Sequence, residues 1–490
     1  MTCSNRLRAM LLGATLLTPS LAAAAPPSDP TPAELRAAVD ALAVQVKALQ
    51  AQLDGMKAAV VKETPSWKGA PQFDDKDAGF SFKPRGLLQA DAGYVGFPNG
   101  RELSGTVGGL DYNRLGFNTR LRRATLGAEG SLQGGFGYNV EFNFAQGTVD
   151  FEDIFLAYQA KGSPVRIQLG NIYPLSSLET ITSSRFTSFL ERASFTDGFG
   201  YNRRLGVTVA LLDPKSDRYT LTGGLFSQPV NDNSFTRTGW EVGARGTFSP
   251  KLGDTTLHLG ASAHHRVNNR DAQGQQYRSR PLVQTTDQRL VDTGMVASDG
   301  DDAAGLEFGA IHHGLHLAAE AQMLWVRGYR PGDVTTHPNN LILGKRYAGN
   351  PSFTGGYVEA GYYFTGEMRG YRAGRWDRTK VLHPLGKGGW GALQLNGRID
   401  YLNLSDRVSG APLAAPDYVD GGRQIGYQLS LAWNPTDYVR FIAQYGRLRV
   451  NGGPRVVAGT PGLFSPGTTV PVDQRAFDVD TGALRAQLDF

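Results

Sequence analysis

Residues 476–490 read AFDVDTGALRAQLDF, and apolar residues alternate with polar ones through the second half of this stretch. The apolar set is Leu484, Ala486, Leu488 and Phe490, and the polar set is Arg485, Gln487 and Asp489. Successive side chains of a β-strand point to opposite faces, so the stretch predicts a strand with one apolar and one polar face. A soluble sheet buries the apolar face in a core, whereas a membrane barrel turns it toward lipid and fills its centre with polar groups.

The composition favours an all-β protein. Of 490 residues, 62 are Gly, 24 Phe and 19 Tyr, while Met (6) and Cys (1) are rare. This balance favours strands and turns over helices. Mean hydropathy is −0.30, and beyond the N-terminus no apolar run reaches the roughly 18 residues that a spanning helix needs. A β-barrel meets this constraint because only alternate residues of its strands must be apolar.

The first 25 residues have the pattern of an export signal. Arg6 and Arg8 supply positive charge, residues 10–21 are mostly apolar, and residues 22–25 offer a small-residue cleavage site. We expect residues 1–25 to be a signal peptide; a membrane anchor is the alternative, but the apolar stretch is too short to span. Removal would take Cys3, the single cysteine, and leave a weakly basic chain without disulfides.

Residues 26–63 predict a proline-rich lead-in and then a helix. Apolar residues recur there with heptad spacing: Leu35, Val39, Leu42, Val46, Leu49, Leu53, Met56 and Val60. We expect a short coiled-coil helix that pairs with copies of itself; an amphipathic helix lying on its own barrel is the alternative. Valine at the a positions with leucine at d favours two strands in parallel coiled coils. Residues 64–79 are expected to be a polar linker.

Residues 80–490 hold about sixteen candidate strands, and single-chain bacterial barrels have an even number. The connections alternate between mostly short and mostly long, as periplasmic turns and outer loops do in such barrels. Aromatic residues cluster near strand ends, where the lipid interfaces would lie. The connection 365–389 breaks the alternation, and nothing in the sequence explains its length. The predicted fold is an all-β transmembrane antiparallel β-barrel of about 16 strands.

Arginines fall on the polar faces of several predicted strands: Arg123, Arg166, Arg245, Arg398 and Arg440. A charged side chain facing lipid near mid-membrane costs about 2–4 kcal/mol, so these side chains should point into the lumen. Guanidinium forks there would attract anions and match phosphate geometry. Acidic residues, among them Glu141, Asp153, Glu241, Glu320 and Asp400, also fall on polar faces. Two interpretations therefore stand side by side: an anion-selective lumen, or a lumen of mutually paired charges.

Residues 173–203 are the candidate constriction. Ser183, Ser184 and Arg185 lie there among apolar residues such as Ile181 and Phe186. A hydrated outer loop need not be so apolar, but a loop folded into the barrel and packed on its wall would be. The two hydroxyls and Arg185 would then meet a passing ion, because rings of charged side chains select ions in channels.

Short stretches recur in a fixed order along residues 80–490. They are SFK (81–83) with LQAD (88–91), LRRA (121–124), SSR (183–185) with LER (190–192), RSRP (278–281) with VDTG (291–294), GY (356–357) leading to FTGE (364–367), GGWG (388–391) and the terminal DF (489–490). In this order they resemble the phosphate-selective porins O and P of bacterial outer membranes.

The resemblance implies a sixteen-stranded barrel that forms a homotrimer, an inward-folded third loop, and a ladder of pore arginines guiding phosphate, polyphosphate or similar small anions. By position, Arg122, Arg123, Arg278 and Arg280 resemble ladder members. Arg122 and Arg123 are adjacent, so alternation cannot direct both inward, and one is expected at a bulge or rim. Leu87 stands where a ladder arginine is expected, and Arg185 replaces a lysine, which changes donor geometry but keeps the charge. Both departures bear on phosphate selectivity more than on anion preference.

The leading prediction is a passive, water-filled, anion-preferring porin of the bacterial outer membrane, with membrane lipid, small anions and its own copies as partners. A general porin of low selectivity is the alternative. A barrel-scaffold enzyme would need a nucleophile with a base. The densest cluster, His312, His313 and His316, lies at a predicted turn without such a partner, so these histidines are interpreted as surface polar residues. A structural or adhesive barrel would favour a plugged lumen. We expect no catalytic residue, cofactor, metal or nucleic-acid partner.

Overall fold

The computed structural model describes residues 31–63, 66–67, 69–75, 78–97, 106–107, 110–111, 114–213, 215–230, 239–268, 274–329, 348–406, 419–452 and 476–490. The chain divides into two compact units, Met1–Thr64 and Pro65–Phe490, and each is described by itself. The predicted signal peptide lies outside the described residues. Within them, no helix combines the length and apolar character that crossing a bilayer requires.

The first unit contains one long helix, α1 (Pro32–Glu63). An N-terminal helix was predicted here and is confirmed. Its heptad residues from Leu35 to Leu53 are 48–64% exposed, so nothing within the described residues of this unit covers the apolar seam. Pairing of this seam with other copies stays a prediction.

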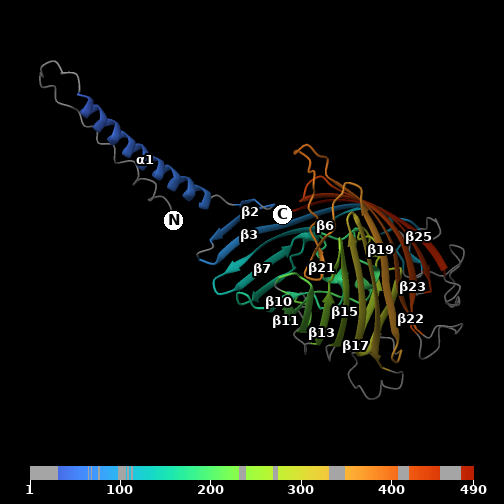
Figure 1. Cartoon of the computed structure of the whole chain (residues 1–490). Helices are drawn as coiled ribbons and strands as arrows, with labels where there is room; N and C mark the ends of the chain where they lie inside the picture. Colours follow the sequence, from blue (N-terminus) through green and yellow to red (C-terminus); the bar gives the residue numbers. More distant parts are fainter. Residues whose placement is uncertain are drawn as a thin grey trace. The chain divides into compact units, whose positions relative to one another are not determined.

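Sixteen strands within the described residues of the second unit form a closed antiparallel circuit, which Figure 1 shows. The circuit closes where the last strand pairs with the first. The strands, in circuit order, are β3 (Phe80–Val95), β6 (Gly116–Leu132), β7 (Phe136–Asn143), β9 (Ile154–Tyr158), β10 (Val165–Ile172), β11 (Arg204–Leu212), β12 (Tyr219–Phe226), β13 (Trp240–Phe248), β15 (Thr255–Val267), β17 (Val291–His312), β18 (Leu315–Gly328), β19 (Ser352–Tyr363), β22 (Ala392–Asp406), β23 (Val419–Asn434), β24 (Val439–Asn451) and β25 (Ala476–Asp489). The predicted all-β antiparallel barrel of about 16 strands is confirmed.

Shorter elements occupy the connections and the barrel's start. They are β1 (Ser66–Trp67), β2 (Pro71–Asp75), β4 (Thr106–Val107), β5 (Leu110–Asp111), β8 (Asp150–Phe151), β14 (Lys251–Leu252), β16 (Gly274–Ser279), β20 (Gly370–Arg372), β21 (Arg375–Asp377), the 3₁₀ helix η3 (Ala145–Gly147), and the helices α2 (Leu178–Ile181) and α3 (Ser194–Gly198).

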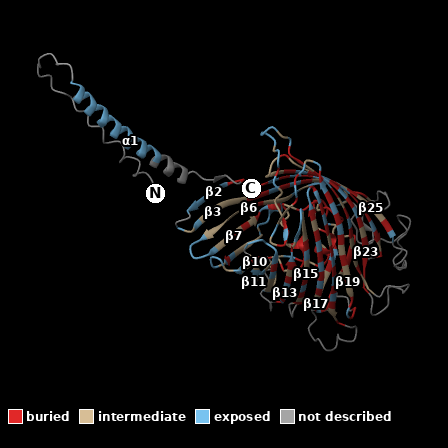
Figure 2. Ribbon diagram, in the orientation of Figure 1, coloured by how far each residue is buried: buried red, intermediate tan, exposed pale blue. Residues whose placement is uncertain are grey.

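Burial alternates residue by residue along the barrel strands, as the red and blue bands in Figure 2 show. In β25 the Arg485 side chain is 2% exposed, whereas Leu484 is 61% exposed. The polar face of this strand therefore points into the barrel and the apolar face points outward, which is the arrangement of a membrane barrel.

The chain's last residue closes the circuit. Gly86 in β3 and Phe490 exchange two backbone hydrogen bonds of 3.1 Å. The Phe490 ring lies so near that a Cβ on Gly86 would approach it to 2.3 Å. Glycine at position 86 therefore leaves room for the Phe490 ring in this position.

The connection between β10 and β11, residues 173–203, lies against the inner wall. Its Leu178 and Glu179 amides donate to Glu320 of β18 at 3.0 and 2.8 Å. On other strands, its Leu190 amide donates to Gln444 of β24 and its Ser194 amide to Asp400 of β22, at 2.9 and 2.8 Å. Its polar groups thus meet inward-facing side chains on several strands.

The long connection between β19 and β22 also lies inside the barrel. Its β20–β21 hairpin places the Tyr371 hydroxyl 2.5 Å from Ser249 and 2.6 Å from His258, next to inward-facing residues of β13 and β15. Trp376 of the hairpin is 2% exposed, and Gly374 accepts a hydrogen bond of 2.8 Å from Arg245. The connection 365–389, whose length the sequence did not explain, thus forms a hairpin inside the lumen.

Candidate functional site

A β-bulge directs two adjacent arginines into the lumen. In the β3–β6 pairing, Gln89 faces Arg123 and Ala90 faces Leu121, so Arg122 is the extra residue. Arg123 donates to buried Gln89 at 2.7 Å. Arg122 donates at 2.9 and 3.1 Å to Glu191 of residues 173–203, the connection between β10 and β11, which we call the inserted loop. A bulge shifts the alternation by one residue, which is how both side chains come to point inward.

These two arginines line a polar cavity of about 310 Å³, here called the arginine cavity. Five arginines and two carboxylates contribute to its wall: Arg120, Arg122, Arg123, Arg192 and Arg280, with Glu191 and Asp197. The remaining lining includes the hydroxyl groups of Tyr173, Ser194, Thr196 and Ser279. The cavity therefore carries an excess of positive charge together with neutral hydrogen-bond donors.

Glu191 is the main counter-charge of the cavity. It accepts hydrogen bonds from Arg122 and, at 2.9 Å, from Arg485. Arg485 also donates two hydrogen bonds of 2.7 Å to Asp91. Burial alone would raise the pKa of Glu191, but Arg122 and Arg485 hold it well below its ordinary value. The carboxylate therefore stays ionised and fixes two arginines in place.

Arg278 and Arg280, the other two predicted ladder members, have different surroundings. Arg280 lines the cavity, and its guanidinium is 3.8 Å from Asp197. Burial lowers the pKa of Arg280, Asp197 opposes this, and Arg122 lowers it further. Arg278, two residues before it in β16, is exposed and is not among the cavity's lining residues.

Three other predicted pore arginines are paired with carboxylates. Arg185 donates to Glu141 at 2.6 Å. Arg245 donates to both oxygens of Glu307 at 2.8 and 2.6 Å. Arg398 bonds Glu179 and Glu359 at 2.6 and 2.5 Å and lies between two aromatic rings. These side chains are committed to neighbours within the protein.

Arg123, Arg166 and Arg440 form the opposite group, since none of them has a carboxylate partner within the described residues. Arg440 donates to the Thr187 carbonyl at 2.7 Å. Arg166 lies 5.9 Å from the centre of the Phe155 ring. Their charge is therefore less compensated than that of the paired group.

The predicted serines lie at the start of the inserted loop. Ser183 accepts a 3.4 Å hydrogen bond from the Arg185 amide, and the Ser184 carbonyl accepts one of 3.3 Å from Gln89. Both serines are partly exposed. The structure thus holds this segment beside Gln89, the partner of Arg123.

Sequence reasoning missed two arginines of the cavity. Arg120 precedes the bulge and donates to the Gln284 carbonyl at 2.7 Å. Arg192 anchors the inserted loop through the carbonyls of Glu179 and Thr182 at 2.7 and 2.6 Å. Arg120 could have been found by counting alternation separately on each side of the bulge, whereas Arg192 belonged to a loop without periodicity.

His316 was interpreted as a surface residue, and that interpretation is wrong. Its ring is buried and lies 3.0 Å from Glu359 and 2.8 Å from Arg369. His313 is in the β17–β18 turn, as predicted. Within the described residues, no group of three or more His, Cys, Asp or Glu side chains has the geometry to hold a metal ion.

Comparison with known proteins decides the family. The model of phosphate-selective porin O and P matches residues 104–453, which is well over half of the chain. The chain belongs to this family. It is therefore a barrel porin, a channel of the outer membrane.

A relative from Caulobacter vibrioides, described as an uncharacterized protein, is 34% identical over 527 residues, covering 98% of this chain and 95% of its own. Among solved structures, an anion-selective porin from Comamonas acidovorans is 13% identical with a TM-score of 0.43, covering 83% of this chain and 99% of that one. The outer membrane channel DcaP of Acinetobacter baumannii is 12% identical with a TM-score of 0.45, covering 85% and 99%. Likenesses this distant do not bear on what the present porin conducts.

Proposed function

We propose that this porin is an anion-preferring channel in which phosphate or a similar small anion passes through the arginine cavity. The observation that carries the proposal is the charge of that cavity, where five arginines meet two carboxylates. Low-dielectric walls focus the field of uncompensated charge, which raises the local concentration of counter-ions.

The choice of phosphate rests on donor geometry. Guanidinium forks pair with phosphate oxygens through two parallel hydrogen bonds, and hydroxyl groups can complete the shell. Arg123 is the strongest candidate to contact the ion, because its only described side-chain partner is the neutral Gln89. Ser183 and Ser184 lie near this pair, and Arg440 and Arg166 are candidates for further steps along the path.

Reversal potentials in planar bilayers test the anion preference. In a potassium chloride gradient we expect the potential to favour chloride, and a channel that prefers potassium would contradict the proposal. Adding inorganic phosphate then tests the solute: binding in the cavity should reduce the chloride current. An unchanged current would favour a general porin of low selectivity.

We further propose that three chains assemble and that the exposed heptad seam of α1 helps to hold them together. Deleting residues 32–62 should weaken oligomers on native gels while the barrel stays folded. Leu42→Asp with Leu49→Asp, both on the seam, should reproduce this loss, because charge at d positions disrupts packing between helices. Ala41→Asp with Ala48→Asp, one position off the seam, is the matched control. Equal oligomers in all forms would remove the role of the helix.

A further inference from the structure

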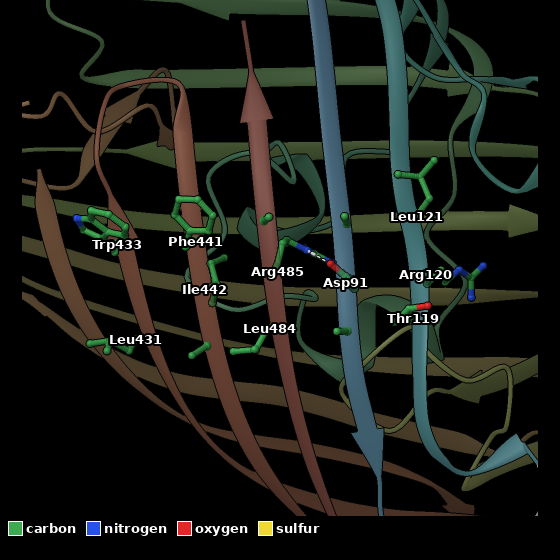
Figure 3. A pocket seen from close by; sticks show the side chains of 14 residues that line it. Asp91, Thr119, Arg120, Leu121, Leu431, Trp433, Phe441, Ile442, Leu484 and Arg485 are labelled. Carbon is green, nitrogen blue, oxygen red and sulfur yellow. Dashed lines mark hydrogen bonds and ion pairs between the residues drawn. The ribbon is translucent and has the colours of Figure 1, made fainter. Parts of the chain in front are cut away.

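The outward face of six neighbouring strands, from β22 through β23, β24, β25 and β3 to β6, carries a groove. Two hollows of about 670 and 470 Å³ compose it, and their linings share Ala92, Leu431, Ala443 and Leu484. Ligand sites for small molecules typically have roughly 300–1,000 Å³, so the space suffices for a ligand. Figure 3 shows the larger hollow, with Leu431, Phe441 and Leu484 on neighbouring strands and Leu121 across from them. We call it the outer groove.

Small residues produce the outer groove. They occupy outward positions on three adjacent strands: Ala443 of β24, Gly482 and Ala486 of β25, and Ala90 and Ala92 of β3. Larger residues flank them on paired positions, with Leu431 opposite Ala443 and Leu121 opposite Ala90. The floor is therefore low on either side of Leu484, which is 61% exposed and pairs with Ala443 on one side and Ala92 on the other.

Aromatic residues mark both ends of the outer groove. Trp433 and Phe441 stack at one end, with ring centres 5.5 Å apart. Tyr94, Phe117 and Tyr445 lie at the other end, nearer the long loops. Both hollows have lining residues on β24, β25 and β3, so the groove extends along these strands across the outward apolar face.

A basic cluster follows directly on the loop side of the groove. Arg423 of β23 and Arg447 and Arg449 of β24 share the outward face with Tyr427 and Tyr445. At a strand rise of about 3.3 Å, Arg449 lies roughly 26 Å along the strand from Phe441, which is about the height of the apolar band of a membrane barrel, so Arg449 is near the loop-side interface.

The charges of this cluster are only partly compensated. Arg447 bonds Asp478 at 2.7 Å and Asp480 at 3.5 Å. Arg449 lies 5.7 Å from the centre of the Tyr427 ring, and within the described residues neither Arg423 nor Arg449 has a carboxylate partner. Two exposed guanidinium groups are thus available to an outside anion.

We propose that the outer groove and this cluster form one binding site for an anionic lipid of the outer leaflet. The headgroup phosphate bonds Arg423 and Arg449, and an acyl chain lies on the floor of small residues. Basic residues at the membrane surface attract anionic headgroups, and apolar lining retains an alkyl chain. A second copy of the chain is the competing occupant, but it accounts only for the apolar part of the site. The proposal is independent of the channel's ion preference.

Native mass spectrometry of the full-length porin tests the site. The porin is released by detergent from vesicles of dioleoyl phosphatidylglycerol and dioleoyl phosphatidylcholine, whose acyl chains are identical and whose headgroups differ in charge. We expect retained phosphatidylglycerol on the wild type. Arg423→Gln with Arg449→Gln should reduce that retention about thirtyfold, because two surface charges are lost, each worth about 1 kcal/mol. Ala443→Trp should reduce it similarly by filling the floor, although the basic cluster remains.

The matched controls lie on β18. Arg327→Gln removes an outward arginine that bonds Asp302, and Ala321→Trp enlarges an exposed outward alanine. Both controls should retain lipid as the wild type does, and unchanged conductance shows that each variant has folded. Displacement of the adduct by inorganic phosphate alone would reduce the site to a phosphate site without an acyl component.

Two further results would overturn the proposal. Equal retention of the two lipids by the wild type would show that the basic cluster does not distinguish an anionic headgroup from a neutral one. Loss of oligomers in Ala443→Trp, without any change in retained lipid, would assign the groove to a contact between copies.

Discussion

Two regions of the lumen use arginine in opposite ways. The arginine cavity places five arginines against two carboxylates. In the second region, by contrast, Arg398 bonds Glu179 and Glu359, and Arg369 also bonds Glu359; we call these four residues the ion-pair network. In the cavity positive charge is in excess, whereas in the network each arginine is paired with a carboxylate.

The difference teaches that the count of lumenal arginines does not measure attraction for anions. Arg398 is fully buried between Phe189 and Tyr357 and bonds two carboxylates. A guanidinium whose charge is compensated by two carboxylates contributes to the fold, but it exerts little electrostatic attraction on a solute. Arg123 has the neutral amide of Gln89 as its partner, so its positive charge can still attract an anion. Selectivity should therefore depend on the cavity, and stability on the network.

The largest expected effect is on stability. Arg398→Met leaves Glu179 and Glu359 without their shared partner, and breaking a buried pair in this way costs about 3–5 kcal/mol. Heat- or urea-induced unfolding, followed by the migration shift of folded barrels on gels, measures the loss. If Arg398→Met with Glu359→Gln costs as much as the two single changes added together, the two residues do not act as a pair.

A second test separates the network from the channel. Replacing residues 370–377 with a short Gly-Ser linker removes the lumenal hairpin, including Tyr371 and Trp376. We expect single-channel conductance to rise roughly twofold or more, because the water-filled channel widens when the hairpin is removed from the lumen. Anion preference should change little, since the hairpin contributes no residue to the arginine cavity. If deletion of the hairpin abolished anion preference, selectivity would depend on the hairpin and not on the arginine cavity.

The smallest effect in energy concerns Arg123. Arg123→Glu changes the charge at the cavity lining by two units, each worth about 1 kcal/mol at a few ångströms in water, so the anion-to-cation permeability ratio should fall roughly thirtyfold. Reversal potentials measure the ratio. Arg278→Gln is the control, because Arg278 is exposed outside the cavity lining, and it should leave the ratio near that of the wild type. Equal effects of the two changes would contradict the assignment of the cavity.

Much of the barrel could be predicted from alternation, because each strand's lipid face must be apolar along its whole length. The adjacent Arg122 and Arg123 even predicted an irregularity, and the β3–β6 pairing has a bulge at that point. The hairpin in connection 365–389 could not be predicted, because its Tyr371 and Trp376 are fixed by residues of β13, β15 and β17 rather than by a local pattern.

Outside the bulge at Arg122, periodicity determined which side chains of the barrel strands point inward, since a period of two allows one choice per strand once lipid lies outside. It did not determine which inward arginines remain free to meet an anion. Arg398 finds Glu179 across 219 residues, and Arg245 finds Glu307 across 62. Only the closed barrel brings such pairs together, because ion pairing depends on distance in space and not on distance along the chain.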